Sequence, residues 1–268
     1  MKINSKNKFT FYGLIIFFLT GICFTGYGLK IRSDYINKLS KIKKQDSISR
    51  EISVIKPIIK KIKIKRGHFW LILPGDYKQG KDYPVIIYLH GRKYDPPNVD
   101  RARLHLIHKW LKNITVLRSI VALPMLPRTS YPTWTMRDNA YLKTTIDVVV
   151  NRFATKDSKI FLSGFSAGAL HSIYVTLNGF IKADGVCAFA YGLAQDIRTI
   201  KHLVKDLPIF LAVGKNDRFT RMNVLYSYRM LKKFHFKDLT YREYSIGHWV
   251  HDDFIVDMEK WVFSKSKS

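Results

Sequence analysis

Cysteine and acidic residues are both scarce in this chain. Its 268 residues include two cysteines, Cys23 and Cys187, too few for the disulfide framework on which many small secreted domains depend. Asp and Glu number 20 against 46 Lys and Arg, so the formal net charge is +26. The lysines come with no nucleic-acid-binding motif, and the chain has no internal repeat or low-complexity block. We therefore expect neither a disulfide scaffold nor a nucleic-acid partner.

Length and composition limit the number of domains. A hydrophobic content of 47% over 268 residues can fill one full α/β core but not the cores of two large domains. We expect an N-terminal membrane anchor or signal segment at 1–30, a basic spacer at 31–63, and one folded domain at 64–268. From Lys56 to Arg66 an Ile-Lys pattern recurs, with strict alternation at 62–65, which predicts a strand with one wet, basic face.

An almost uncharged run from Phe9 to Leu29 follows the first lysines of the chain. It is long enough to cross a bilayer as a helix, which predicts a signal anchor or a long signal peptide. We expect residues 9–29 to attach the protein to a membrane. Lysines also follow the run and oppose export under the positive-inside rule, but lysine is abundant throughout the chain. We expect the folded domain on the exported side, periplasmic or extracellular.

The most informative motif is a Gly-Phe-Ser-Ala-Gly sequence at 164–168. The apolar run before it predicts a strand, and the residues after it predict a helix. A serine held in a sharp strand-to-helix turn needs neighbours without bulk, which Gly164 and Gly168 provide. The helix N-terminus adds unpaired N–H groups where a negatively charged oxygen would form. The motif therefore predicts a nucleophile at Ser166.

A serine nucleophile needs a base to take its proton and a carboxylate to orient that base. The apolar run 208–213 predicts a strand that ends in a Gly-Lys-Asn-Asp turn with Asp217. A second predicted strand, 239–244, is followed by a Gly-His pair that ends at His248. Like Ser166, both residues follow a predicted strand, and the ends of parallel strands meet at one edge of an open α/β sheet. We expect the three side chains to meet there.

With these motifs, the chain from about residue 64 onward resembles an α/β-hydrolase. Within that superfamily it is most similar to serine esterases related to polyhydroxybutyrate depolymerases and feruloyl esterases. The resemblance includes the apolar run 84–89, which ends in His-Gly-Arg at 90–92, like the His-Gly motif after the third strand of this fold. It implies a mostly parallel central sheet with helices on both faces. Residues 186–208 hold no obvious insertion, which implies little or no cap and an open site.

The resemblance also implies a role for each site residue. By motif, Ser166 matches the nucleophile, Asp217 the acid and His248 the base. Backbone N–H groups of Arg92 and Ala167 match the oxyanion hole. The implied chemistry uses no cofactor and no metal.

Two residues compete for the acid and base roles. Asp196 follows an earlier strand-like run, where some hydrolases place the acid, and His251 lies shortly after His248. We prefer Asp217 because its turn is the commoner arrangement in this fold. We prefer His248 because glycine precedes it and it comes first after the strand.

The histidines near the C-terminus also allow a metal-binding interpretation. His248, His251 and the aspartates at 252–253 are residue types that ligate metals. Acidic residues at 252–253 also suit a helix N-terminus, and the apolar residues that follow have helical spacing. We favour the helix and expect no metal site.

A long loop with prolines and aromatic residues, 124–134, follows the predicted strand 119–123. It would overhang the catalytic end of the sheet. Tyr131 and Trp134 in this loop are candidates for substrate-binding residues. The alternative is that both rings pack on the edge of the domain.

These residues predict a serine hydrolase that cleaves small-molecule or polymeric carboxylic esters through an acyl-enzyme. One alternative is a serine peptidase of the prolyl-oligopeptidase type, although that type generally carries a propeller domain for which 268 residues leave no room. The other alternative is a non-catalytic, membrane-bound binding protein with a hydrolase fold. An intact serine, aspartate and histidine in the expected order favours the enzyme.

Overall fold

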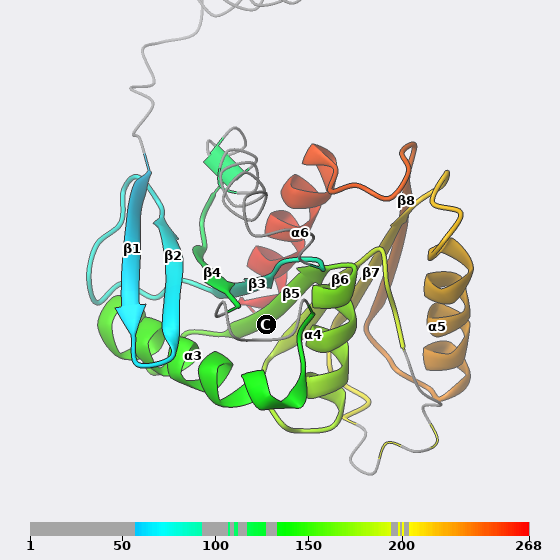
Figure 1. Ribbon diagram of the computed structural model, residues 1–268, viewed down its shortest axis with the longest axis horizontal. Coiled ribbons are helices and arrows are strands. Elements are labelled where there is room, and N and C mark those ends of the chain that lie inside the picture. Colours follow the sequence, from blue (N-terminus) through cyan, green and yellow to red (C-terminus); the bar gives the residue numbers. More distant parts are fainter. Residues whose placement is uncertain are drawn as a thin grey trace, which may run out of the picture. The chain divides into compact units, whose positions relative to one another are not determined.

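The computed structural model describes residues 57–92, 107, 110–111, 117–126, 133–193, 198, 200 and 204–267. They form an eight-stranded sheet with the strand order β1-β2-β4-β3-β5-β6-β7-β8 (Figure 1). The strands are β1 (Ile58–Ile64), β2 (Gly67–Leu73), β3 (Val85–Leu89), β4 (Ile120–Met125), β5 (Ile160–Phe165), β6 (Gly185–Phe189), β7 (Ile209–Gly214) and β8 (Leu239–Tyr244).

The sheet is mostly parallel, as predicted. β1 pairs antiparallel with β2, and β2 pairs antiparallel with β4. The other neighbouring strands pair in parallel, from β4 through β3, β5, β6 and β7 to β8. The middle strands β3, β4, β6 and β7 are buried along their whole length. Such strands are covered on both faces, which is why they read as uninterrupted apolar runs in the sequence.

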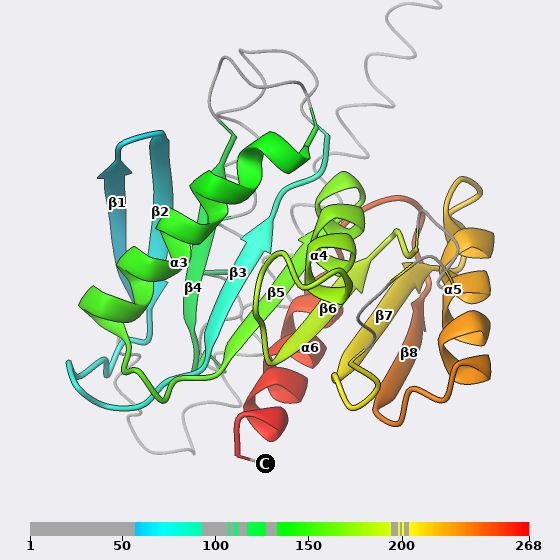
Figure 2. The ribbon, with the colours of Figure 1, turned by 90° about the horizontal axis from the view of Figure 1, so that it is seen from below.

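Helices cover both faces of the sheet, again as predicted. The helices whose bounds fall within the described residues are η3 (Met136–Asp138), α3 (Asn139–Phe153), α4 (Ala167–Leu177), α5 (Arg221–Lys233) and α6 (Asp252–Lys265). Side chains of α3, α4 and α5 share one apolar cluster with Val85 and Ile87 of β3. Side chains of α6 share a second cluster with Ile86 and Tyr88, which point to the opposite face. Figure 2 shows α3 and α4 on the near side of the strands and α6 behind them.

The edge strand β1 carries the predicted alternation of isoleucine and lysine. Its residues from Ile58 to Lys61 are exposed, and it pairs in register along the whole of β2. The ammonium of Lys61 lies 5.7 Å from the centre of the Trp70 ring, so its stem covers apolar surface while its charge stays in water. The sheet therefore begins within the segment that we expected to be a basic spacer.

The expectation of a membrane-spanning helix is contradicted. In the described ranges between residues 57 and 267, no helix has both the length and the apolar character needed to cross a bilayer. The described helices instead pack one face on the sheet and carry charged residues elsewhere, as α6 does with Asp257 and Lys260. The run 9–29 itself lies outside the described residues. The predictions of a membrane anchor and of an exported, membrane-associated domain are corrected accordingly.

Candidate active site

Ser166 makes the turn between β5 and α4 by itself. Its φ of 53° and ψ of −116° lie in a region that residues with a side chain rarely adopt. Its backbone N–H donates to the carbonyl oxygen of Phe189 at 2.8 Å, and its own carbonyl accepts from Leu170 N–H at 3.0 Å. A strained serine held by surrounding hydrogen bonds at a strand-to-helix turn is typical of a nucleophile elbow.

The two glycines of the motif allow three segments to meet around this serine. A Cβ on Gly168 would lie 2.2 Å from the carbonyl oxygen of Leu89, at the end of β3. A Cβ on Gly164 would lie 2.5 Å from the carbonyl carbon of Gly168. Only glycine permits either approach, because the opposing atoms belong to the backbone and cannot rotate away. Glycine is therefore required at both positions, as the sequence predicted.

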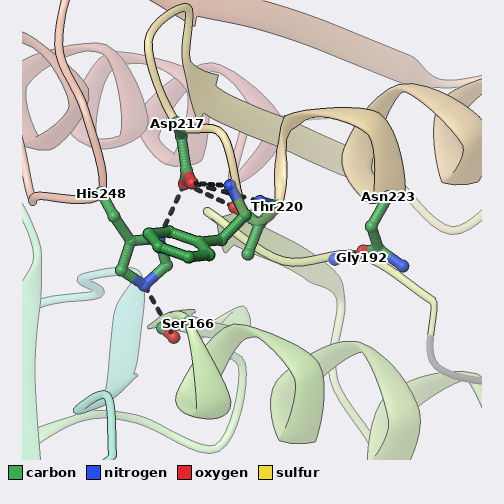
Figure 3. A network of polar contacts seen from close by, with 7 residues as sticks. Ser166, Gly192, Asp217, Thr220, Asn223 and His248 are labelled. Atoms are coloured by element: carbon green, nitrogen blue, oxygen red, sulfur yellow. Dashed lines mark hydrogen bonds and ion pairs between the residues drawn. The ribbon is translucent and has the colours of Figure 1, made fainter.

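The structure brings Ser166, His248 and Asp217 together (Figure 3). Nε2 of His248 lies 3.0 Å from Oγ of Ser166, and Nδ1 of His248 lies 2.7 Å from Oδ2 of Asp217. A carboxylate can only accept at Nδ1, so the neutral imidazole carries its proton there and leaves Nε2 free to accept the serine proton. This arrangement can activate a hydroxyl as a nucleophile.

Asp217 is held as an oriented carboxylate. It is 1% exposed, and its Oδ1 accepts from the backbone N–H groups of Phe219 and Thr220, both at 3.1 Å. Its Oδ2 also accepts from the Thr220 hydroxyl at 2.5 Å. Burial by itself would raise the pKa of Asp217, but the hydrogen bonds from Thr220 and His248 outweigh it and lower that pKa below its ordinary value. The group is therefore ionised at neutral pH and can stabilise a protonated His248.

Backbone contacts fix the loops that carry the acid and the base. Lys215 N–H donates to the Tyr244 carbonyl at 2.7 Å, and Asn216 N–H donates to the Ile246 carbonyl at 2.9 Å. A Cβ on Gly214 would lie 2.4 Å from the Ile246 carbonyl oxygen, so glycine is needed where the two loops cross. The spacing of Asp217 and His248 is thus set by main-chain packing.

Two segments provide the candidate oxyanion donors. Ala167 is the first residue of α4, whose N-terminus offers unpaired N–H groups and a positive dipole end. Gly91 and the exposed Arg92 follow β3. The His90 ring has its Nδ1 2.6 Å from the Gly91 carbonyl oxygen, and its Nε2 accepts from Leu126 N–H at 3.4 Å. A neutral His90 protonated at Nδ1 satisfies both contacts and braces this loop.

Of the two predicted substrate-binding residues, Trp134 lies among the described residues. Tyr131 lies outside the described residues. Trp134 is 6% exposed, and its indole Nε1 donates to the His90 carbonyl at 2.8 Å. Its ring lies 5.1 Å from the His90 ring and 6.0 Å from the His171 ring. These contacts tie Trp134 to the loop of the candidate oxyanion hole, and its contact with substrate stays a prediction.

His251, the alternative candidate for the base, has a structural contact of its own. His251 caps α6, where its Nδ1 accepts from Asp253 N–H at 3.1 Å, and its ring stacks on Tyr244. Asp196 lies outside the described residues. Across the described parts of the chain, no group of three or more His, Cys, Asp or Glu residues is arranged to hold a metal ion.

The residues that support Asp217 and the neighbouring loops were not predicted from the sequence. Thr220 gives Asp217 a hydroxyl and a backbone donor, and its signal was an Asp-x-x-Thr spacing just before a predicted helix. Asn223 accepts from Gly192 N–H at 2.8 Å and so ties the loop after β6 to α5 (Figure 3). Ala190, in the same loop, has a φ of 59°, a strained value that no local pattern indicates.

Comparisons with known proteins find one matching family. A family model described as Phospholipase/Carboxylesterase matches residues 132–264, a range that includes Ser166, Asp217 and His248. Comparison with curated proteins gives no match.

Solved structures share the fold. Acyl-protein thioesterase 2 of Zea mays has a TM-score of 0.54 and 18% identity, over 74% of this chain and 98% of that one. A ferulic acid esterase of Anaeromyces mucronatus, in complex with ferulic acid, has a TM-score of 0.55 and 20% identity, over 82% of this chain and 95% of that one. At such low identity the likeness is one of fold.

Proposed function

We propose that this chain, which has the α/β-hydrolase fold, is a hydrolase of the carboxylic ester class and acts as a serine esterase with Ser166 as nucleophile. The observation that carries the proposal is the pair of contacts made by His248. One ring nitrogen lies 3.0 Å from the serine hydroxyl and the other lies 2.7 Å from the Asp217 carboxylate. The strained backbone of Ser166 supports the same role, because the fold maintains it at an energetic cost.

Acylation begins when Ser166 Oγ attacks the ester carbonyl carbon. Its proton passes to Nε2 of His248, the Oγ–C bond forms, and the carbonyl oxygen becomes an oxyanion. Backbone N–H groups of Ala167 and Arg92 are the proposed donors to that oxyanion. The C–O bond to the alcohol then breaks, and His248 gives its proton to the departing oxygen. The acyl group stays on Ser166.

Deacylation repeats these steps with water. His248 takes a proton from a water molecule as it attacks the acyl carbonyl, and then returns a proton to Ser166 Oγ as the carboxylic acid leaves. In both halves the buried Asp217 carboxylate stabilises the imidazolium, and its lowered pKa keeps it charged while it does so. Small-molecule and polymeric esters both remain candidate substrates for this chemistry.

Labelling with a fluorophosphonate tests the proposal, because the probe reacts with an activated serine. We expect the wild type to be labelled once and Ser166→Ala to lose the label. Ser245→Ala is the matched control, since Ser245 is exposed on the loop before His248 and should leave labelling unchanged. A panel of ester and peptide substrates then separates an esterase from a peptidase. Full labelling of Ser166→Ala would remove Ser166 from the role of nucleophile.

A further inference from the structure

Two large aromatic side chains stand in water beside the acid and the base. Phe219 is 89% exposed, and Trp249 is 73% exposed. Their backbones are nonetheless fixed. Phe219 N–H donates to Oδ1 of Asp217 at 3.1 Å, and Trp249, the residue after His248, donates to the Gly247 carbonyl at 3.0 Å. A single exposed aromatic is ordinary, but these two flank the same hydrogen-bonded pair.

The proposed reaction determines which part of the substrate lies there. The oxygen of the leaving alcohol must approach Nε2 of His248 closely enough to receive its proton. The oxyanion must instead face the N-terminus of α4 at Ala167. The alcohol portion of the ester therefore lies on the His248 side of the site, next to the loops that carry Trp249 and Phe219.

We propose that Phe219 and Trp249 bind the alcohol portion of the ester and select a bulky, uncharged, apolar alcohol. This inference rests on the proposed function, because the leaving group is placed by the proton transfer from His248. Covering two exposed rings with an apolar group removes apolar surface from water on both sides, which favours a large alcohol over a small one.

Charge on the same loop decides against a cationic alcohol. Aromatic faces can attract a quaternary ammonium, so rings alone do not exclude a choline ester. Lys215 and Arg218, however, are both exposed on the loop that carries Asp217 and Phe219. Their two positive charges exceed the one negative charge of Asp217 on that loop, so the loop disfavours a cationic alcohol and leaves an uncharged alcohol unaffected.

A matched set of butanoate esters measures the selection directly. Ethyl, 3,3-dimethylbutyl and choline butanoate share one acyl group and form the same acyl-enzyme, so their kcat/KM values differ only through the alcohol. The 3,3-dimethylbutyl group has the shape of choline without its charge. We expect the wild type to prefer the 3,3-dimethylbutyl ester over each of the other two by about tenfold, the range of discrimination that apolar contacts support.

Alanine variants test whether the two rings are responsible. Phe219→Ala and Trp249→Ala should each lower kcat/KM for the 3,3-dimethylbutyl ester by about tenfold and for the ethyl ester by less than about twofold. Phe180→Ala is the matched control, because Phe180 is 41% exposed and follows the end of α4 remote from Ser166. It should leave all three values unchanged. Methyl esters of longer acids should be affected no more than the ethyl ester.

The possible failures are distinguishable. Preference for the choline ester would overturn the inference, since the rings would then hold a cation. Equal losses on all three esters, or equal losses in Phe180→Ala, would overturn it as well, because no alcohol-specific contact would remain. In these cases hydrolysis of ethyl butanoate persists and the proposed function stands. If the wild type hydrolyses none of the esters, the proposed function fails and takes the inference with it.

Discussion

The indole Nε1 of Trp134 donates a hydrogen bond of 2.8 Å to the main-chain oxygen of His90. His90 precedes Gly91 and Arg92, the segment proposed to help hold the oxyanion, and its ring also contacts the Gly91 carbonyl. A carbonyl that accepts from a buried indole is fixed in direction, and so is the peptide chain that follows it. Trp134 therefore fixes the backbone of His90, the first residue of the proposed oxyanion loop (residues 90–92).

We predict that Trp134→Phe lowers kcat by about tenfold and changes KM by less than about twofold. The substitution keeps an aromatic ring but removes the donor to His90 O, so the oxyanion loop loses its orientation while substrate contacts remain. Steady-state kinetics on one ester would show the split between kcat and KM.

Trp70→Phe is the control for that experiment. The buried Nε1 of Trp70 has no hydrogen-bond partner among the residues that the structure describes, so its removal should change neither kcat nor KM. A similar loss of kcat in both variants would mean that the indole of Trp134 matters for packing alone.

The two C-terminal histidines should respond very differently to removal. We predict that His248→Ala lowers kcat by about 10⁴-fold, because it removes the group that lies between Ser166 and Asp217. His251→Ala should leave kcat within about twofold and lower the free energy of unfolding by about 1 kcal/mol, the usual effect of losing a helix cap. Kinetics and urea unfolding of both variants check the ranking, and the opposite ranking would transfer the base role to His251.

The strands and the order of the site residues could be predicted because their signals are local. β3 and β7 are buried throughout and therefore appear as unbroken apolar runs. Ser166, Asp217 and His248 follow β5, β7 and β8 in turn, each with a glycine nearby, and the ends of parallel strands meet at one edge.

Contacts between distant segments could not be predicted in this way. Trp134 and His90 are 44 residues apart, and no periodicity links an indole to a particular carbonyl. The membrane prediction depended on the length and low charge of one run, and no helix in the described part of the chain has those properties. The Ile-Lys pattern from Lys56 to Arg66 predicted the strand β1, but the folded domain was expected to begin only at residue 64, because a lysine-rich edge strand reads locally like a solvated spacer.

We predict that Gly168→Ala strongly destabilises the protein. Its Cβ would lie 2.2 Å from the Leu89 carbonyl oxygen and 2.6 Å from that of His90, and neither backbone atom can move without shifting the end of β3 from α4. We expect a loss of about 1–3 kcal/mol in the free energy of unfolding, as for overpacked cores, together with loss of fluorophosphonate labelling.

Gly247→Ala provides the comparison. No heavy atom lies within 4 Å of a Cβ at Gly247, so this variant should unfold with a free energy within about 0.5 kcal/mol of the wild type. Equal stability of the two variants in urea unfolding would mean that β3 and α4 are not in rigid contact at Gly168.

Glu259 gives the fold a dependence on pH that is separate from catalysis. It lies on α6 and is 2% exposed. Oε1 accepts from Arg118 N–H at 2.5 Å and from the Ser119 hydroxyl at 2.9 Å, whereas Oε2 is buried with no hydrogen-bond partner among the described residues. Burial raises the pKa of Glu259 to about 7, against the lowering effect of those hydrogen bonds. In the folded protein this carboxyl group therefore holds its proton at pH values where the unfolded chain has lost it.

We predict that Glu259→Gln becomes progressively more stable than the wild type between about pH 5 and pH 7, by up to about 3 kcal/mol. Over that window the folded wild type binds more protons than the unfolded chain, so its unfolding free energy falls as pH rises and stops falling above the folded pKa. Glutamine keeps the acceptor for Ser119 but does not titrate. Urea unfolding of both proteins at several pH values gives the difference.

Glu243→Gln is the control, because hydrogen bonds from Arg221 and Tyr241 lower the pKa of Glu243 and its titration lies below this window. Its difference from the wild type should stay constant, and a constant difference for Glu259→Gln too would show that the buried carboxyl group titrates normally.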